Sequence, residues 1–156
     1  MTNDFQAQAE KRMAALEGWL APIFAKAPHL PPNIRQTLTK IAPWLALIGG
    51  ILGVLGFLSA GAFGSIVSLS FLGMGMVSIT WYVAVLIGLI AAVLDLLAYK
   101  PLSKMSKKGW DFLFYGTVLM TASSIIDIAI GYGMTGNLIG DIVGLWLLFE
   151  VREMYR

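Results

Sequence analysis

The sequence contains no cysteine and a single histidine, His29, which lies in a proline-rich stretch. The absence of cysteine excludes a disulfide framework, a thiolate metal site and a cysteine nucleophile. One histidine in a loop cannot complete a Ser-His-Asp triad or ligate a metal or haem inside an apolar bundle, and we expect it to be solvated. We therefore expect a protein that is not an enzyme and that has no cofactor, no metal and no nucleic-acid partner.

Charged residues are also scarce, at 13% of the 156 residues, whereas hydrophobic residues make up 58%. An average soluble domain is about 25% charged and about 45–50% apolar. The chain is long enough for roughly one domain, and that domain has too little polar surface to face water on all sides. The composition excludes an ordinary water-soluble fold and predicts an integral membrane protein whose main partner is the lipid bilayer.

The distribution of basic residues indicates where the membrane lies. All eleven Lys and Arg residues fall within residues 11–40, 100–108 and 152–156, and the two stretches between these groups contain none. A crossing needs about 20 apolar residues, at about 1.5 Å per residue, to traverse about 30 Å of hydrocarbon. Each stretch can therefore hold two crossings. We predict an all-α membrane four-helix bundle with spans at residues 43–64, 79–99, 110–131 and 137–151.

An even number of crossings places all three basic groups on one side of the membrane. The positive-inside rule assigns that side to the cytoplasm, so both termini should be cytoplasmic. Aromatic residues near the predicted span ends, among them Trp44 and Trp110, fit the belts that tryptophan forms at membrane interfaces.

Residues 1–42 precede the first predicted span and should form an amphipathic helix and a hinge. At about 100° per residue, six apolar side chains fall on one arc: Phe5, Ala9, Met13, Leu16, Trp19 and Leu20. Pro22 should kink or end this helix, and the prolines within residues 27–33 exclude regular helix there. A helix can resume with Asn33 as its N-cap and bend at Pro43. The amphipathic helix should lie in the cytoplasmic interface or pack on the bundle, or else sense a membrane or dock a partner, since all these roles need the same apolar face.

Three acids inside the apolar stretches are the candidate polar or ion site: Asp95, Asp127 and Asp141. Acids in a membrane are costly and therefore mark candidate functional sites. Asp95 lies five residues before Lys100, so we expect it in the cytoplasmic leaflet, paired with a lysine. Asp127 and Asp141 flank the last predicted turn at similar depth, where they could share a proton or hold a cation. The alternative is two hydrated residues at the ends of their spans.

Small residues recur along the first predicted span at spacings of three and four: Gly49, Gly53, Gly56, Ala60 and Gly64. This pattern is typical of membrane helices whose backbones approach a neighbour closely. The neighbour can be another helix of the same chain or a different protein, and the pattern alone leaves both possibilities open.

Three runs of residues carry a resemblance: Leu30-Pro31 with Ala42-Pro43-Trp44-Leu45, Lys108-Gly109-Trp110-Asp111-Phe112-Leu113-Phe114-Tyr115, and Leu147-Leu148-Phe149-Glu150-Val151-Arg152. Through these runs, residues 30–156 resemble small, uncharacterised four-span proteins of bacterial membranes. The resemblance implies a multi-pass protein of the bacterial inner membrane, and it implies no activity.

Together these patterns favour a non-enzymatic accessory, scaffold or assembly subunit that acts through helix packing and an interfacial helix. Its partners would be other membrane-protein subunits or further copies of itself. The alternative is a small transporter or channel that uses Asp127, Asp141 and Asp95 as its polar groups.

Overall fold

The described part of the chain folds into five α-helices. The computed structural model describes the backbone of residues 2–70, 75–129, 131 and 135–155, and the side chains of residues 7–8, 11–62, 82–129, 131 and 137–155. The helices are α1 (Thr2–Phe24), α2 (Pro32–Ser70), α3 (Gly75–Ser103), α4 (Lys107–Ala129) and α5 (Thr135–Val151), followed by the short 3-10 turn η1 (Arg152–Met154). The expectation of an all-α protein is confirmed.

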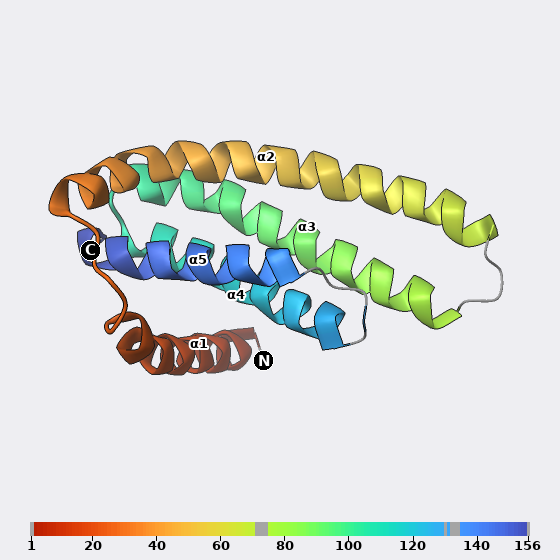
Figure 1. Cartoon of the computed structure of the whole chain (residues 1–156), viewed down its shortest axis with the longest axis horizontal. Coiled ribbons are helices and arrows are strands. Elements are labelled where there is room, and N and C mark those ends of the chain that lie inside the picture. The colour runs from red at the N-terminus through yellow and green to blue at the C-terminus, as the bar shows by residue number, and fades with distance from the viewer. Residues whose placement is uncertain (1, 71–74, 130, 132–134, 156) are drawn as a thin grey trace.

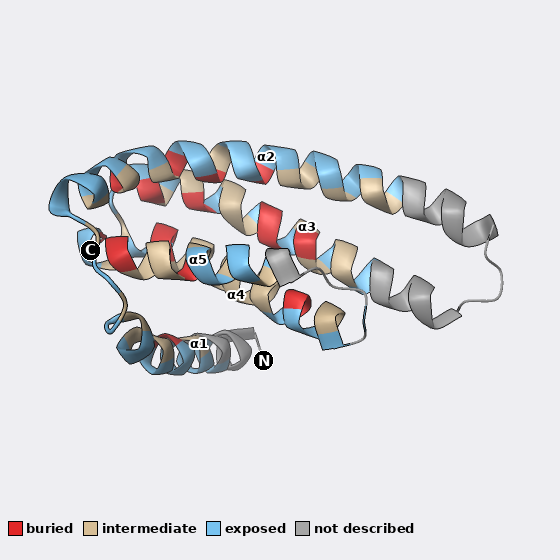
Figure 2. Cartoon of the chain, in the orientation of Figure 1, coloured by how far each residue is buried: buried red, intermediate tan, exposed pale blue. Residues whose placement is uncertain are grey.

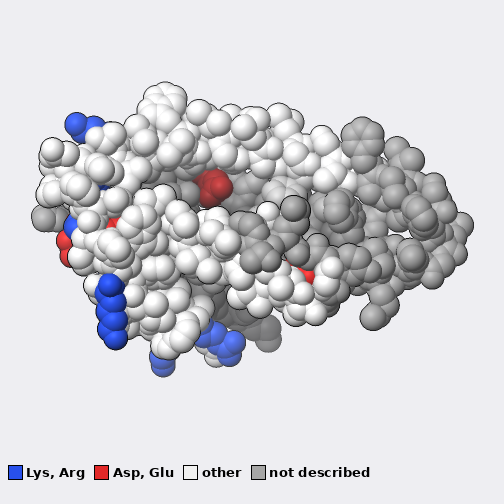
Figure 3. All heavy atoms as spheres, in the orientation of Figure 1, with Lys and Arg blue, Asp and Glu red and all other residues white. Residues whose placement is uncertain are grey.

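Helices α2 to α5 form an elongated bundle in which each helix packs on the next along the chain (Figure 1). By contrast, α2 and α5 touch each other only slightly. The start of α2, the turn between α3 and α4, and the C-terminus lie together at one end of the bundle (Figure 1). Lysine and arginine side chains gather there (Figure 3), so we call it the basic end.

Three helical segments are long and apolar enough to cross a membrane: Pro32–Ala62, Tyr82–Ser103 and Lys107–Ala129. They are the features expected of a multi-pass membrane protein. Helix α5 has 17 residues, and at about 1.5 Å per residue this is roughly 25 Å, shorter than the hydrocarbon layer. A fourth crossing is therefore not established by length.

The first proline of α2 acts differently from the expectation. Helix α2 begins at Pro32 rather than after Asn33, and Pro43 lies inside it as part of one helix of 39 residues. Proline is tolerated in a first helical turn because the N–H that it lacks would have no intrahelical acceptor there. The carbonyl of Pro31 instead accepts hydrogen bonds from the next free amides, those of Ile34 and Arg35, at 2.9 and 3.2 Å. Thus the first candidate span starts well before residue 43.

The N-terminal helix ends as its proline predicts. Pro22 lies inside α1, and the helix stops two residues later, at Phe24. The linker that follows, residues 25–31, is not helical. The break between the amphipathic segment and the bundle is therefore real, but it lies two residues earlier than the expected stretch 27–33, because Pro32 and Asn33 already belong to α2.

The best-buried part of the bundle lies toward the basic end (Figure 2). Trp110 is 0% exposed, its ring stacks on Phe114 at 5.1 Å, and its Nε1 donates to the carbonyl of Leu148 at 2.7 Å. The expectation that Trp110 belongs to an interfacial belt is therefore wrong, because its N–H has found a protein acceptor in the core. Trp44 remains 58% exposed on α2 and packs edge-on against Tyr99.

Candidate functional site

A cavity of about 290 Å³ opens between α2 and α5. Its lining is almost entirely aliphatic: Leu38, Ala42, Leu45 and Ala46 of α2, Leu113 and Thr117 of α4, Gly144, Leu147, Leu148 and Val151 of α5, and Asp95 of α3. Figure 3 shows an acidic side chain at the bottom of a hollow between these two helices, and Asp95 is the acid among the lining residues. We call the surface around this opening the α2–α5 seam.

The seam is open because small residues occupy the facing sides of its two helices. Ala42 and Ala46 project from α2, and Gly144 projects no side chain from α5. A Cβ atom added at Gly144 would already lie 3.7 Å from the methyl group of Thr117. In lipid, no hydrophobic force draws two helices together to close such a gap, since acyl chains are as apolar as leucine.

Asp95 lies partly buried on α3 and faces Gly116 of α4. Its Oδ1 atom is 3.5 Å from the place where a Cβ at Gly116 would stand. Within the described part of the chain, no side chain forms an ion pair with Asp95. The expected pairing with a lysine is therefore not seen. Lys100 is exposed, and five residues further along the helix its side chain is rotated by about 140°.

The other two predicted acids lie farther from the basic end, and the structure does not join them to each other. The hydroxyl of Ser124, on α4, donates to Oδ2 of Asp141, on α5, at 2.6 Å. Asp127 has no hydrogen bond to Asp141 in the described structure. Among the described residues, no group of three or more His, Cys, Asp or Glu side chains is placed to hold a metal ion. What this region does contain is one serine–aspartate bridge between the last two helices.

The predicted glycine stripe divides between two faces of α2. A Cβ at Gly53 would stand 2.8 Å from Cβ of Ala92 on α3, whereas at Gly49 and Gly56 it would meet nothing within 4 Å. Ala60 is partly buried, and Gly64 is outside the described side chains. At two glycines that the pattern did not single out, an added Cβ atom would also stand too close to a neighbouring side chain: Leu96 at Gly50, and Phe57 at Gly88.

A second polar group of residues, at the basic end, was not predicted. Glu150 of α5 is 6% exposed and holds both the linker and α2. It accepts hydrogen bonds from His29 Nδ1 at 2.7 Å and from the Leu30 amide at 2.9 Å. It also forms an ion pair with Arg35, whose Nε lies 3.1 Å away and donates its proton to the Leu30 carbonyl. His29 lies in the linker with 57% of its side chain exposed, as expected of a solvated loop residue, but its Nδ1 atom is also held by this carboxylate, which the sequence did not predict.

Helix α1 is fixed to the same end of the bundle. Glu17, 8% exposed, pairs with Arg152 and lies 3.8 Å from Lys107 Nζ. The ring of Phe24 stacks on Phe149 at 5.0 Å. A helix that sequence reasoning placed in the interface or on the bundle thus has definite contacts with α5 and with the start of α4.

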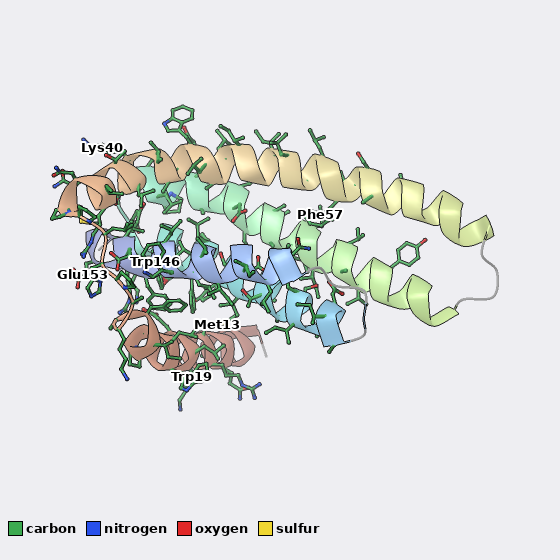
Figure 4. All side chains as sticks on the ribbon, viewed as in Figure 1. Met13, Trp19, Lys40, Phe57, Trp146 and Glu153 are labelled. Carbon is green, nitrogen blue, oxygen red and sulfur yellow. The ribbon has the colours of Figure 1, made fainter. Side chains whose placement is uncertain are left out.

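The apolar arc predicted for α1 separates into an inner and an outer face. Met13 and Leu20 are partly buried, whereas Leu16 and Trp19 are 41% and 66% exposed. Figure 4 shows Met13 on the side of α1 that faces the bundle and Trp19 on the opposite side. The side chain of Phe5 is outside the described residues.

Comparison of the chain with protein-family models, with curated proteins and with solved structures finds no match.

Proposed function

We propose that the protein is a non-enzymatic accessory, scaffold or assembly subunit of the bacterial inner membrane, and that another membrane component binds at the α2–α5 seam. The observation that carries this proposal is the cavity in the seam, with Asp95 at its base and no partner for that carboxylate within the described chain. Placing a carboxylate within hydrocarbon costs about 2.5–3.5 kcal/mol on insertion scales. A component that covers the seam and neutralises the charge would offset this cost.

We further propose that α5 is a fourth crossing, so that both termini lie in the cytoplasm. Leu30, just before α2, contacts Glu150, at the end of α5, which means that the bundle starts and finishes at the same end. This arrangement fits an even number of crossings with the basic end inside. A locally thinned bilayer accommodates a helix of this length.

In this proposal α1 is an interfacial helix with two distinct contacts. Its inner face holds it to the bundle through Glu17 and Phe24. Its outer face presents Leu16, Trp19 and Ile23, all more than 40% exposed, beside charged residues. Amphipathic helices with exposed tryptophan and isoleucine insert shallowly at the headgroup boundary.

A small transporter or channel is the second candidate, because Asp95 lies within the candidate membrane segment Tyr82–Ser103 and ionisable groups in spans often mark transport paths. Replacing Asp127, Asp141 and Asp95 together by Asn in proteoliposomes tests it. Proton or cation flux in the parent protein that disappears in the triple variant would favour transport over the subunit role.

Photo-crosslinking tests the leading proposal. A photo-activated amino acid replaces Leu45, which lines the cavity and is 57% exposed, and in a control it replaces Ile48, which is 53% exposed and does not line it. In native membranes the probe at residue 45 should give one protein adduct of defined mass, and the probe at residue 48 only lipid adducts. Ala42→Leu, which fills the cavity from α2, should remove the adduct. Lipid adducts alone at residue 45 would reject the proposed role.

A further inference from the structure

We propose that the cavity in the α2–α5 seam receives a lysine or arginine side chain carried by a transmembrane helix of a different protein, and that this cation pairs with Asp95. The inference rests on the proposed function, because it names the chemistry of the partner that the seam would bind. Three independent features of the molecule lead to it: the environment of Asp95, the position of this chain's own basic residues, and the shape and lining of the cavity.

The environment of Asp95 calls for a cation. Its carboxylate lies at the base of an aliphatic cavity, against the backbone of α4 at Gly116. Thr117, the other polar side chain in the lining, donates its hydroxyl proton to the carbonyl of Leu113 at 2.8 Å. A charged group in an apolar setting is stable when an opposite charge with good geometry meets it.

The apolar parts of this chain's own helices carry no cation at the depth of Asp95. Residues 41–99 and 109–151 contain no Lys or Arg, so a second copy packed on the seam would have none at this depth either. Two arginines of the basic end are already paired, Arg35 with Glu150 and Arg152 with Glu17. Among the described residues, Lys40 and Lys100, the lysines nearest to the lining residues in sequence, form no ion pair with Asp95. We therefore assign the missing cation to a different molecule.

The cavity fits a long basic side chain better than a bare metal ion. Calcium and magnesium need six or more oxygen ligands, whereas the lining offers one carboxylate and one engaged hydroxyl. The aliphatic stem of a lysine or arginine would lie against Leu38, Leu45 and Leu148, with its charge at the carboxylate. A helix along the seam would also cover Leu45, which is otherwise 57% exposed.

The depth of the site sets the register of the partner helix. Asp95 lies five residues before Lys100, which is about 7.5 Å inside the basic end along the axis. The basic residue of the partner should therefore lie about five residues inside the cytoplasmic end of its own span, close enough to the interface for its insertion to be tolerated.

A synthetic helix in vesicles tests the inference on the full-length protein. The chain has no cysteine, so one fluorophore can be attached at a cysteine introduced at the exposed position Ser103. The probe is a leucine–alanine transmembrane peptide of about 20 residues with a second fluorophore and one lysine five residues from its end, in phosphatidylcholine vesicles. Energy transfer should show that this peptide associates about tenfold more strongly than the same peptide with leucine in place of lysine.

Variants at Asp95 and Asp127 test whether association of the peptide requires the Asp95 carboxylate or only the shape of the bundle. Asp95→Asn should reduce association of the lysine peptide to the level of the leucine peptide, and Asp95→Glu should retain most of it. Asp127→Asn is the matched control and should leave it unchanged, and thermal unfolding in detergent checks that each variant is folded. Equal association of the two peptides, or an unaffected Asp95→Asn variant, would overturn the inference. Dodecylammonium, a single-chain amphiphile with an ammonium head group, tests the other occupant. If it bound to the protein but not to Asp95→Asn, while the lysine peptide did not bind, the occupant would be a small amphiphile and the inference would be overturned.

The two failures can be told apart. If a protein adduct forms at residue 45 in native membranes but persists in Asp95→Asn, the subunit role stands and the charge pairing is wrong. If the lysine peptide binds through Asp95 but native membranes give only lipid adducts, the site has the stated chemistry and the subunit role is wrong.

Discussion

At the scale of single residues, Glu150 joins parts of the chain that are 120 positions apart. Its side chain is 3% exposed and meets His29, Leu30 and Arg35 at distances of 3.1 Å or less. Hydrogen bonds to an ionised carboxylate are roughly twice as strong as those between neutral groups. Because one of these donors is a backbone amide of the linker, Glu150 fixes the path of the main chain between α1 and α2.

Glu150→Gln should release this linker. The neutral amide keeps one oxygen but loses the charge that attracts Arg35, and it leaves a donor group facing other donors, so we expect a loss of about 1–3 kcal/mol in the free energy of unfolding. Thermal unfolding in detergent and limited proteolysis between residues 25 and 31 measure the effect. Glu153→Gln is the control, since that residue is exposed on the neighbouring turn. Identical midpoints and cleavage patterns in the two variants would contradict the role assigned to Glu150.

Tyr155 gives a pH-dependent test of how the C-terminus is held. Burial raises the pKa of its hydroxyl group to about 12, from about 10 in an unfolded chain. The folded state binds this proton more tightly, so the contribution of Tyr155 is complete below pH about 10 and is lost as pH rises toward 12. Between those values the thermal midpoint of the protein should fall more steeply than that of Tyr155→Phe. Parallel curves for the two proteins would show that Tyr155 does not titrate with the fold.

At the scale of elements, α2 packs closely on α3 because the face of α2 that contacts α3 carries glycines, which have no side chain to hold the helices apart. Gly50 and Gly53 face α3, where a Cβ atom would stand 2.7 Å from Leu96 and 2.8 Å from Ala92. Gly49 is adjacent in sequence, yet a side chain there would meet nothing within 4 Å. The helix therefore has one packing face and one open face, and each contains glycines.

Gly53→Leu should separate α2 from α3 and lower the free energy of unfolding by about 1–3 kcal/mol, as overpacking does in other tightly packed sites. Gly49→Leu should leave stability unchanged, because its side chain would enter open space. Thermal unfolding in detergent compares the two, and the particle size of each variant shows whether the contact is within one chain. Equal stabilities would mean that the α2–α3 contact tolerates a large side chain, and a smaller particle for Gly49→Leu would reveal a contact between chains.

The sequence predicts the elements better than it predicts their contacts. Apolar length and the absence of Lys and Arg locate α2, α3 and α4, because the membrane imposes those two properties on any span. The small-residue spacing identifies Gly53 but cannot tell it from Gly49, since two positions four residues apart differ by only about 40° around a helix. Glu150 and His29 could not be paired in advance, because each is an isolated polar residue and their meeting depends on how α5 packs beside the linker.

At the scale of the whole molecule, the bundle is a row of neighbours rather than a closed ring. Each of α2, α3, α4 and α5 packs on the next, and the first and last of them barely touch. In water such a gap would close around its apolar lining, whereas in lipid it can stay open at little cost. The fold thus leaves a lateral surface available for a partner while the basic end is held firmly by Glu17, Glu150 and Trp110.

The number of crossings follows from whether α5 traverses the bilayer, and single cysteines decide it. Asn137, near the start of α5, and Met154, just after its end, are both exposed. If α5 crosses, a cysteine at Asn137 reacts with an impermeant maleimide added outside the cell, whereas a cysteine at Met154 reacts only after the membrane is opened. A cysteine at Ser103 serves as the internal reference, because it lies at the basic end and should behave like the one at Met154.

We expect labelling of Asn137 from outside and of Met154 only from inside, since the contact between Leu30 and Glu150 requires the start of α2 and the end of α5 to lie on one side. Labelling of Met154 from outside would leave three crossings and place the two ends of the chain on opposite sides of the membrane, which that contact does not allow.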